Sequence, residues 1–141
     1  MATPLRLEDL RDCFDGVLPA VIATCDAEGE PNITYLSKVF LVDSERVALS
    51  NQFFTKTVAN IWQNPQAEVT VMEPGTVRHF RLDVQYERSL DSGELFDSAS
   101  AEIDAVASLM GAENVFRLRA LDVYRVLSIF RVPCDLDEAS D

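Results

Sequence analysis

The sequence predicts a small antiparallel β-barrel with helices packed around it, a mainly β fold with some α content. Short β-like runs follow one another through turn-rich segments such as 26–31 and 73–76, as in hairpins. Helices do not alternate regularly with the strands, which argues against a doubly wound parallel sheet. A chain of 141 residues, 48% of them hydrophobic, is long enough to bury one core. We expect one domain over residues 1–132 and an acidic, flexible tail over 133–141.

The first expected elements are a short helix and a β-meander. Apolar residues at Leu7, Leu10 and Phe14 recur at helical spacing and predict a helix that ends at Gly16. Three β-rich runs joined by short turns follow, and we expect each to pair with the next. These runs are Leu18–Cys25, Asn32–Val42 and Arg46–Asn51.

The remaining chain predicts two helices and three further strands. A helix is expected over Lys56–Gln63, with Pro65 marking its end. A capping-box sequence at Asp91–Glu94 opens a longer helix, whose apolar stripe runs to Met110. The expected strands are Ala67–Met72, Val77–Arg88 and Leu121–Val132. The last of these is apolar on both faces, so we expect both of its faces to be covered.

Charge and composition exclude several classes of partner. A net charge of −12 repels nucleic acid phosphates and anionic membrane surfaces, so neither is an expected partner. No apolar run is long enough to span a bilayer, and the N-terminus lacks the apolar stretch of a signal peptide. Three cysteines and one histidine show no metal-ligand spacing, which predicts no metal site and a reducing, cytoplasmic location.

The segment Ser50–Pro65 carries the clearest chemical signal. It joins a β-like run to a helix, with Thr55, Lys56 and Thr57 at the junction. The first turn of a helix has unpaired backbone N–H groups and partial positive charge, and favours a phosphate dianion. A lysine there opposes the helix dipole by roughly 0.3–1 kcal/mol unless an anion is present. The alternative without a ligand is that Lys56 is a solvated surface lysine.

Several segments, in this order, resemble the FMN-binding split-barrel family of pyridoxamine 5′-phosphate oxidase. They are Leu18–Pro31, Tyr35–Asp43 and Val47–Thr57, with Asn60 and Asn64–Pro65 closing the helix. The resemblance covers nearly the whole chain. It implies a split β-barrel with Greek-key-like connections and flanking helices, and a homodimer with FMN at the interface.

The resemblance also implies a set of cofactor-binding residues. The hydroxyl-and-lysine segment would hold the FMN phosphate, the preceding strand would line the flavin ring, and a later strand would approach the pyrimidine edge. These residues are Tyr35, Ser37, Ser50, Asn51, Gln52, Thr55, Lys56, Thr57 and His79. Two alternatives stay open: His79 as a strand residue that faces water, and Trp62 as a packing residue that does not stack on the ring.

Departures from the family pattern limit the function that is implied. The oxidase itself has an arginine where Tyr35 stands and a C-terminal Arg/His segment that this chain lacks, so vitamin B6 oxidation is not expected. The sequence predicts an FMN-dependent oxidoreductase of unknown substrate, with no catalytic side chain identified. The alternatives are a non-catalytic module that binds flavin, haem or the deazaflavin F420, and a split barrel whose cofactor site has decayed.

Overall fold

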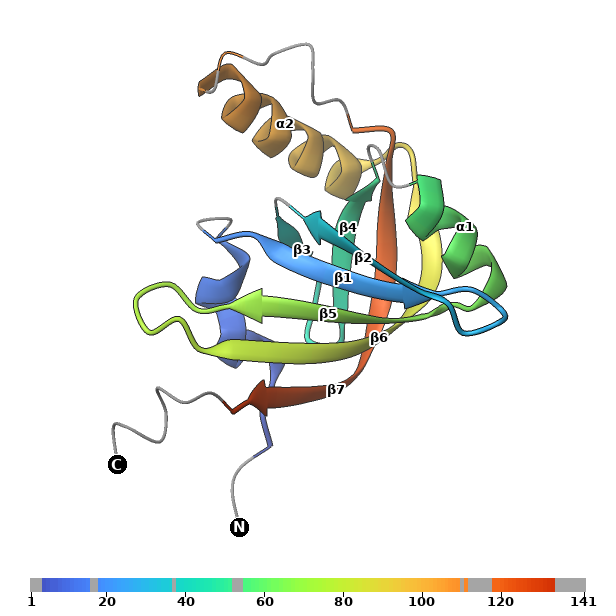
Figure 1. Ribbon diagram of the computed structural model, residues 1–141. Coiled ribbons are helices and arrows are strands. Elements are labelled where there is room, and N and C mark those ends of the chain that lie inside the picture. The colour runs from blue at the N-terminus through green and yellow to red at the C-terminus, as the bar shows by residue number, and fades with distance from the viewer. Residues whose placement is uncertain are drawn as a thin grey trace.

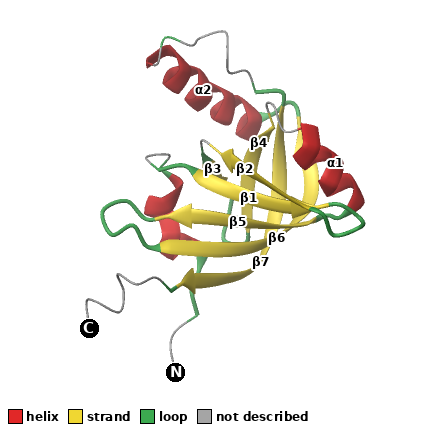
Figure 2. Ribbon diagram, in the orientation of Figure 1, coloured by secondary structure: helices red, strands yellow, loops and turns green. Residues whose placement is uncertain are grey.

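The computed structural model describes residues 4–15, 18–36, 38–51, 55–109, 111 and 118–133. The side chains of Asn51, Thr55 and Val106 also lie outside the described part. The chain forms a strongly curled sheet with helices at its margins (Figures 1 and 2). The predicted mainly β, antiparallel architecture is confirmed. The predicted tail falls almost entirely on residues outside the description.

The strands of the described residues form one seven-stranded sheet, in the order β2-β1-β5-β6-β7-β4-β3, and every neighbouring pair is antiparallel. Strands β2 and β3 follow each other in the chain, yet they form the two opposite edges of the sheet. The curled sheet is therefore a barrel that stays open between them. The strands are β1 (Ala20–Cys25), β2 (Pro31–Leu36), β3 (Val39–Leu41), β4 (Arg46–Asn51), β5 (Gln66–Met72), β6 (His79–Leu90) and β7 (Ala120–Val132).

The prediction of a single strand over Asn32–Val42 was wrong, and with it the simple meander. Strand β2 pairs with β1, whereas β3 pairs with β4 at the other edge. Leu36 and Val39 are both buried although they lie three residues apart. Side chains alternate between the faces of one strand, so both can point inward only if the strand is broken between them.

Three helices complete the described part of the fold. The 3₁₀ helix η1 (Leu7–Phe14) buries its predicted apolar face. Helix α1 (Thr55–Gln63) directly follows the β4 segment, and α2 (Glu94–Leu109) connects β6 to β7. Figure 1 shows α1 beside the sheet and α2 across one end of it. Within the described residues, no helix is long and apolar enough to cross a membrane.

The buried apolar residues form two clusters. The larger cluster lies between η1 and the concave face of the sheet, and includes Leu7, Ile22 and Leu82. The smaller lies between α2 and strands β3, β4 and β7, and includes Ile103 and Leu121. Leu109, predicted to continue the apolar stripe of α2, is instead 89% exposed at the last residue of that helix.

The outer face of the sheet carries two rows of side chains across five strands. Residues paired across neighbouring strands share a face, so the rows follow from the register. One row is Tyr35, Val21, Thr70, Arg81 and Phe130. The other is Ile33, Ala23, Glu68, Asp83 and Ser128. Tyr35, Ile33 and Phe130 are exposed, so the expectation that β7 is covered on both faces is wrong for the single chain.

Two irregularities interrupt the ladder between β6 and β7, one between Tyr86 and Arg88 and one beside Val84. At the first, Tyr86 lies opposite Tyr124 and Ser89 lies opposite Asp122, so Glu87 is an extra residue. A bulge of this kind shifts the alternation of side chains by one position. Tyr86 and Ser89 therefore face the same side although they lie three positions apart in the sequence.

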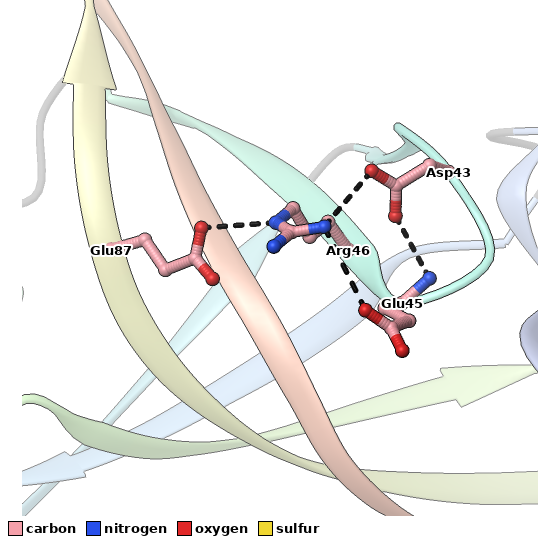
Figure 3. Close-up of polar contacts among 4 residues, drawn as sticks. All are labelled: Asp43, Glu45, Arg46 and Glu87. Carbon is pink, nitrogen blue, oxygen red and sulfur yellow. Dashed lines mark hydrogen bonds and ion pairs between the residues drawn. The ribbon is translucent and has the colours of Figure 1, made fainter.

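Glu87 itself joins a cluster of charges at the surface (Figure 3). The Arg46 guanidinium lies 3.0 Å from Glu87, 3.2 Å from Asp43 and 3.9 Å from Glu45. The hydrogen bond with Glu87 raises the pKa of Arg46, and the bond with Asp43 adds to the effect. One cation thus links the turn before β4 to the bulge of β6.

Candidate functional site

Helix α1 is attached to the β1–β2 hairpin by polar side chains. The Thr57 hydroxyl accepts a hydrogen bond from the Asn32 amide at 3.3 Å and lies 3.4 Å from the Thr34 hydroxyl. One turn further on, the buried Asn60 amide donates to Thr24 at 3.1 Å. These bonds are directional, so they fix both the position and the rotation of the helix.

Thr57 therefore has a structural role that the sequence does not reveal. It was predicted as a phosphate ligand, but it is 5% exposed and its hydroxyl is engaged with β2. The carbonyl oxygen of the Asn60 side chain has no hydrogen-bond partner in the described part of the chain, although the residue is fully buried. A buried water is the usual partner of such an atom.

Lys56 lies in the first turn of α1 with its side chain exposed. Among the described residues it makes no ion pair, whereas Lys38, the other lysine of the chain, pairs with Glu102 of α2. The backbone N–H of Glu30 lowers the pKa of Asp26 in the β1–β2 turn, and the Lys56 charge contributes. Lys56 thus stands beside that turn as a solvent-facing cation at a helix start.

A cavity of about 40 Å³ lies between α1 and the sheet. The predicted residues Ser50 and Thr57 both line it, so the structure brings these two together. Five strands and the helix contribute its walls. The lining residues are Ile22, Leu36, Leu49, Ser50, Thr57, Val58, Ile61, Trp62, Tyr86, Ser89, Asp122 and Tyr124.

Asp122 is the one ionisable carboxyl group among these lining residues. The Ser89 hydroxyl donates to its Oδ1 at 2.6 Å, and the Tyr86 hydroxyl lies 2.7 Å from the Ser89 oxygen. Burial raises the pKa of Asp122, which the hydrogen bond from Ser89 only partly offsets. The bulge at Glu87 is what places Tyr86 and Ser89 on the side that faces Asp122.

Three aromatic rings meet at the same cavity. Tyr86 makes edge-to-face contacts with Trp62 and with Tyr124, each with 5.7 Å between ring centroids. Trp62 is 71% exposed, so the interpretation of it as a packing residue is only partly right. Burial raises the pKa of Tyr124, and the nearby Asp122 adds to this.

The other predicted site residues lie elsewhere. Tyr35 is 74% exposed on the outer face of β2. His79 begins β6 on the same outer face, opposite Met72 and Val132, ten residues along the strand from Ser89. Within one chain, these two residues therefore do not join Ser50 and Thr57. Ser37 and Gln52 lie outside the described residues, as do the side chains of Asn51 and Thr55.

Sequence reasoning missed Asp122, Ser89 and Tyr86. A weak signal was available for Asp122, which is a single acid inside the apolar run Leu121–Val132. Charged residues are rarely buried without a partner or a function. Nothing in the sequence indicated that a bulge would bring Tyr86 and Ser89 to the same side.

The described residues fit one end of FMN. An exposed lysine at the start of α1 and a hydroxyl on β4 are suitable groups for a phosphate. A cavity of about 40 Å³ cannot enclose the ring system, since sites for molecules of that size are on the order of 300–1,000 Å³. The ring would have to lie on an outer surface, where a single chain supplies one wall at most.

Comparison with known families gives a clear match. A family model described as pyridoxamine 5′-phosphate oxidase matches residues 7–127. The chain belongs to this family. The match spans η1 and almost the whole sheet, and the resemblance found in the sequence is confirmed. A comparison with curated proteins gave no significant match.

Solved structures of the same fold include proteins with different ligands. An FMN-binding protein from Syntrophomonas wolfei has a TM-score of 0.74 at 19% identity, covering 91% of this chain and 88% of that one. The haem storage protein HutZ from Vibrio cholerae has a TM-score of 0.57 at 18% identity, covering 90% and 95%. An F420 reductase has a TM-score of 0.59 at 17% identity, covering 80% and 89%. At these identities the likeness shows the fold alone.

No group of three or more His, Cys, Asp and Glu side chains that could hold a metal ion occurs within the described ranges.

Proposed function

We propose that this chain is an FMN-binding flavoprotein and an oxidoreductase whose substrate is unknown. The observation that carries the proposal is Lys56, an exposed cation in the first turn of α1 with no ion pair among the described residues. In a chain of net charge −12, a lysine without a carboxylate partner is suited to an anionic ligand. The family match and the similar FMN-binding structure also support FMN as the ligand.

In this proposal the chain supplies binding and orientation. FMN, when bound, supplies the hydride or electron transfer. Lys56 and the N–H groups at the start of α1 hold the phosphate. The polar bonds from Thr57 and Asn60 keep α1 fixed against the hairpin, so the phosphate site is formed before the ligand arrives.

The proposed active form is a homodimer with the cofactor at its interface. Tyr35 and His79 share the outer face of the sheet, which also exposes Ile33 and Phe130. A second copy on this face would cover the apolar side chains and bring outer-face residues toward the α1 site of its partner. We further propose a cytoplasmic location and a domain boundary near residue 132.

Substitution of Lys56 by Ala tests the phosphate assignment. We expect FMN to bind at least tenfold more weakly to the Lys56→Ala variant, equivalent to about 1.4 kcal/mol. Riboflavin, which lacks the phosphate, should bind both forms equally. Titrations followed by flavin fluorescence measure both affinities. Lys38→Ala is the matched control, because it removes the same charge from a lysine that is paired with Glu102.

Equal losses for FMN and riboflavin in the Lys56→Ala variant would contradict the phosphate assignment. So would an equal loss of FMN affinity in the Lys38→Ala control. Steady NADH or NADPH oxidation by the FMN-loaded protein would support turnover, and its absence with both donors would favour a binding role.

Haem or F420 binding without turnover is the second candidate. The likeness to the haem storage protein HutZ favours haem, and the likeness to an F420 reductase favours F420 as a ligand; His79 is the one histidine available as an axial ligand. The absorption spectrum of purified protein separates the candidates, because haem gives a Soret band and flavin does not. For haem, we expect His79→Ala to remove that band.

A further inference from the structure

The cavity beneath α1 has the wrong charge for an anion. Among the described residues that line it there is no lysine, arginine or histidine, and Asp122 is the one carboxyl group. Its other polar lining groups are the hydroxyls of serine, threonine and tyrosine residues and the indole N–H of Trp62. The hydroxyls accept hydrogen bonds as well as donate them, whereas the indole N–H only donates. The cavity therefore suits a group that donates hydrogen bonds and carries positive charge, and it differs in this from the exposed Lys56 region.

The aromatic walls have the same preference. Trp62, Tyr86 and Tyr124 all line the cavity. The face of an aromatic ring attracts a cation within about 6 Å, most strongly where the cation is shielded from water. Three rings and one carboxyl group around a small space are the components of an ammonium-binding site.

The hydrogen-bond chain leaves one side of Asp122 available. Ser89 donates to Oδ1, and in the described part of the chain no donor contacts Oδ2. When Asp122 is ionised, the single Ser89 proton points to the carboxylate, so Tyr86 must donate its own proton to Ser89. The chain orients the carboxylate without neutralising its charge.

The size of the cavity restricts the ligand. A buried water needs roughly 10–15 Å³ by the same measure, so about 40 Å³ holds two or three water-sized groups. A primary ammonium with its first carbon is of this size. Trp62 and Ser89 are exposed while lining the cavity, so such a group can enter from the surface.

We propose that the cavity beneath α1 binds the primary ammonium group of a small molecule, with Asp122 as counter-ion and Trp62, Tyr86 and Tyr124 as the aromatic wall. This site does not require that FMN be the cofactor. If the proposed flavin function is also correct, the substrate is an amine whose head group is bound beneath α1.

The pH dependence of binding follows from the ionisation of Asp122. Only the carboxylate attracts an ammonium ion, so affinity should rise as pH rises through the pKa of Asp122, which burial has raised. Among the described residues, the groups beside Asp122 are Ser89 and Tyr86 from β6, Tyr124 from β7 and Leu49, its partner on β4. Asp122 is the one carboxyl group among the lining residues, so the rise belongs to it.

The chain contains a built-in probe, because Trp62 is its single tryptophan. We would titrate the cofactor-free protein with n-propylammonium chloride and follow the fluorescence of Trp62. A saturable change is expected with this probe. 1-Propanol, which has the same shape without the charge, and tetramethylammonium, which is too large, should give no saturable change. Inorganic phosphate should not compete.

Two variants and one control test whether n-propylammonium binds at Asp122. Asp122→Asn should weaken n-propylammonium binding at least tenfold, while Asp104→Asn, an exposed acid of α2, should leave it unchanged. Ser89→Ala removes the hydrogen bond that lowers the pKa of Asp122. It should therefore shift the pH midpoint of binding upward, and as an exposed surface change it should leave the fold intact.

The proposal would be overturned by equal responses to n-propylammonium and 1-propanol, or by an unchanged affinity in Asp122→Asn. If Asp122→Asn does not fold, an unshifted pH midpoint in Ser89→Ala overturns it instead. FMN binding is measured in a separate titration. A protein that does not bind FMN can therefore still bind n-propylammonium, and a protein that does not bind n-propylammonium can still bind FMN.

Discussion

Asp122 is the residue at which stability and function are most clearly opposed. Burial raises its pKa, which means that the folded protein disfavours the ionised form. The contribution of this group to stability is most favourable at low pH. It is lost as pH rises from the ordinary aspartate range through the raised pKa of the folded state. An acid that weakens the fold at neutral pH is a candidate for a functional role.

Asp122→Asn should accordingly raise the melting temperature at pH 7. The asparagine carbonyl can still accept the hydrogen bond from Ser89, and it carries no charge that must be buried. The gain should shrink toward zero as pH falls below about 4, where the wild-type group is protonated in both states. Thermal unfolding followed by circular dichroism between pH 3 and 7 measures this. A gain that is independent of pH would show that packing, and not ionisation, is responsible.

At the scale of secondary-structure elements, the docking of α1 differs from that of the other helices. Helix α2 and η1 are held by buried apolar residues. Helix α1 buries Ile61 in the larger cluster, and it also faces the hairpin with the polar residues Thr57 and Asn60. The Asn64 amide, just past the end of the helix, lies 3.0 Å from the Cys25 sulfur and extends this polar row. The stability of α1 therefore depends on specific hydrogen bonds as well as on buried area.

Asn60→Ala should destabilise the protein by about 1–3 kcal/mol, because it leaves the buried Thr24 hydroxyl without its donor. Gln63→Ala is the control from the same helix. Its side chain accepts a bond from the Ala27 N–H at the exposed surface, and its loss should change stability by less than about 1 kcal/mol. Urea unfolding measures both.

The double variant Thr24→Val with Asn60→Leu provides a further check. It replaces both partners by apolar groups of similar shape, which can be nearly neutral. A double variant as unstable as Asn60→Ala would indicate that α1 needs the asparagine for a reason other than this bond, such as a water at its unpaired oxygen.

At the scale of the whole molecule, the outer face of the sheet exposes large apolar side chains in a single chain. Ile33 and Tyr35 on β2 and Phe130 on β7 are exposed at opposite ends of the two rows, with Arg81 above the Phe130 ring at 4.8 Å. Arg81 also lies 3.7 Å from both Glu68 and Asp83. The rows thus leave large apolar side chains exposed at their ends, and a second copy could cover these side chains.

Phe130→Glu should convert the proposed dimer into a monomer, as measured by sedimentation or by light scattering after gel filtration. The added charge would lie in a face that a second copy must bury. Leu109→Glu is the matched control, because Leu109 is more exposed but lies on α2, away from this face. FMN binding should fall with the dimer, whereas n-propylammonium binding should persist. A wild-type protein that is monomeric at high concentration would contradict the dimer.

The sequence by itself determined the elements and the family. Hydrophobic spacing, Pro65 and the turn segments predicted η1, α1, α2 and most strands, because these signals are local and act within a few residues. The order of segments around Lys56 carried the family resemblance, which the match over residues 7–127 confirms.

The tertiary structure decided how the elements pair and where the chemistry lies. Strands β2 and β3 separate to opposite edges, and the Glu87 bulge turns Tyr86 and Ser89 toward Asp122. These placements depend on contacts between residues far apart in the chain, for which a local pattern contains no information. For the same reason the sequence grouped His79 with Ser50, whereas in the curled sheet His79 lies at the start of β6, away from the cavity that Ser50 lines.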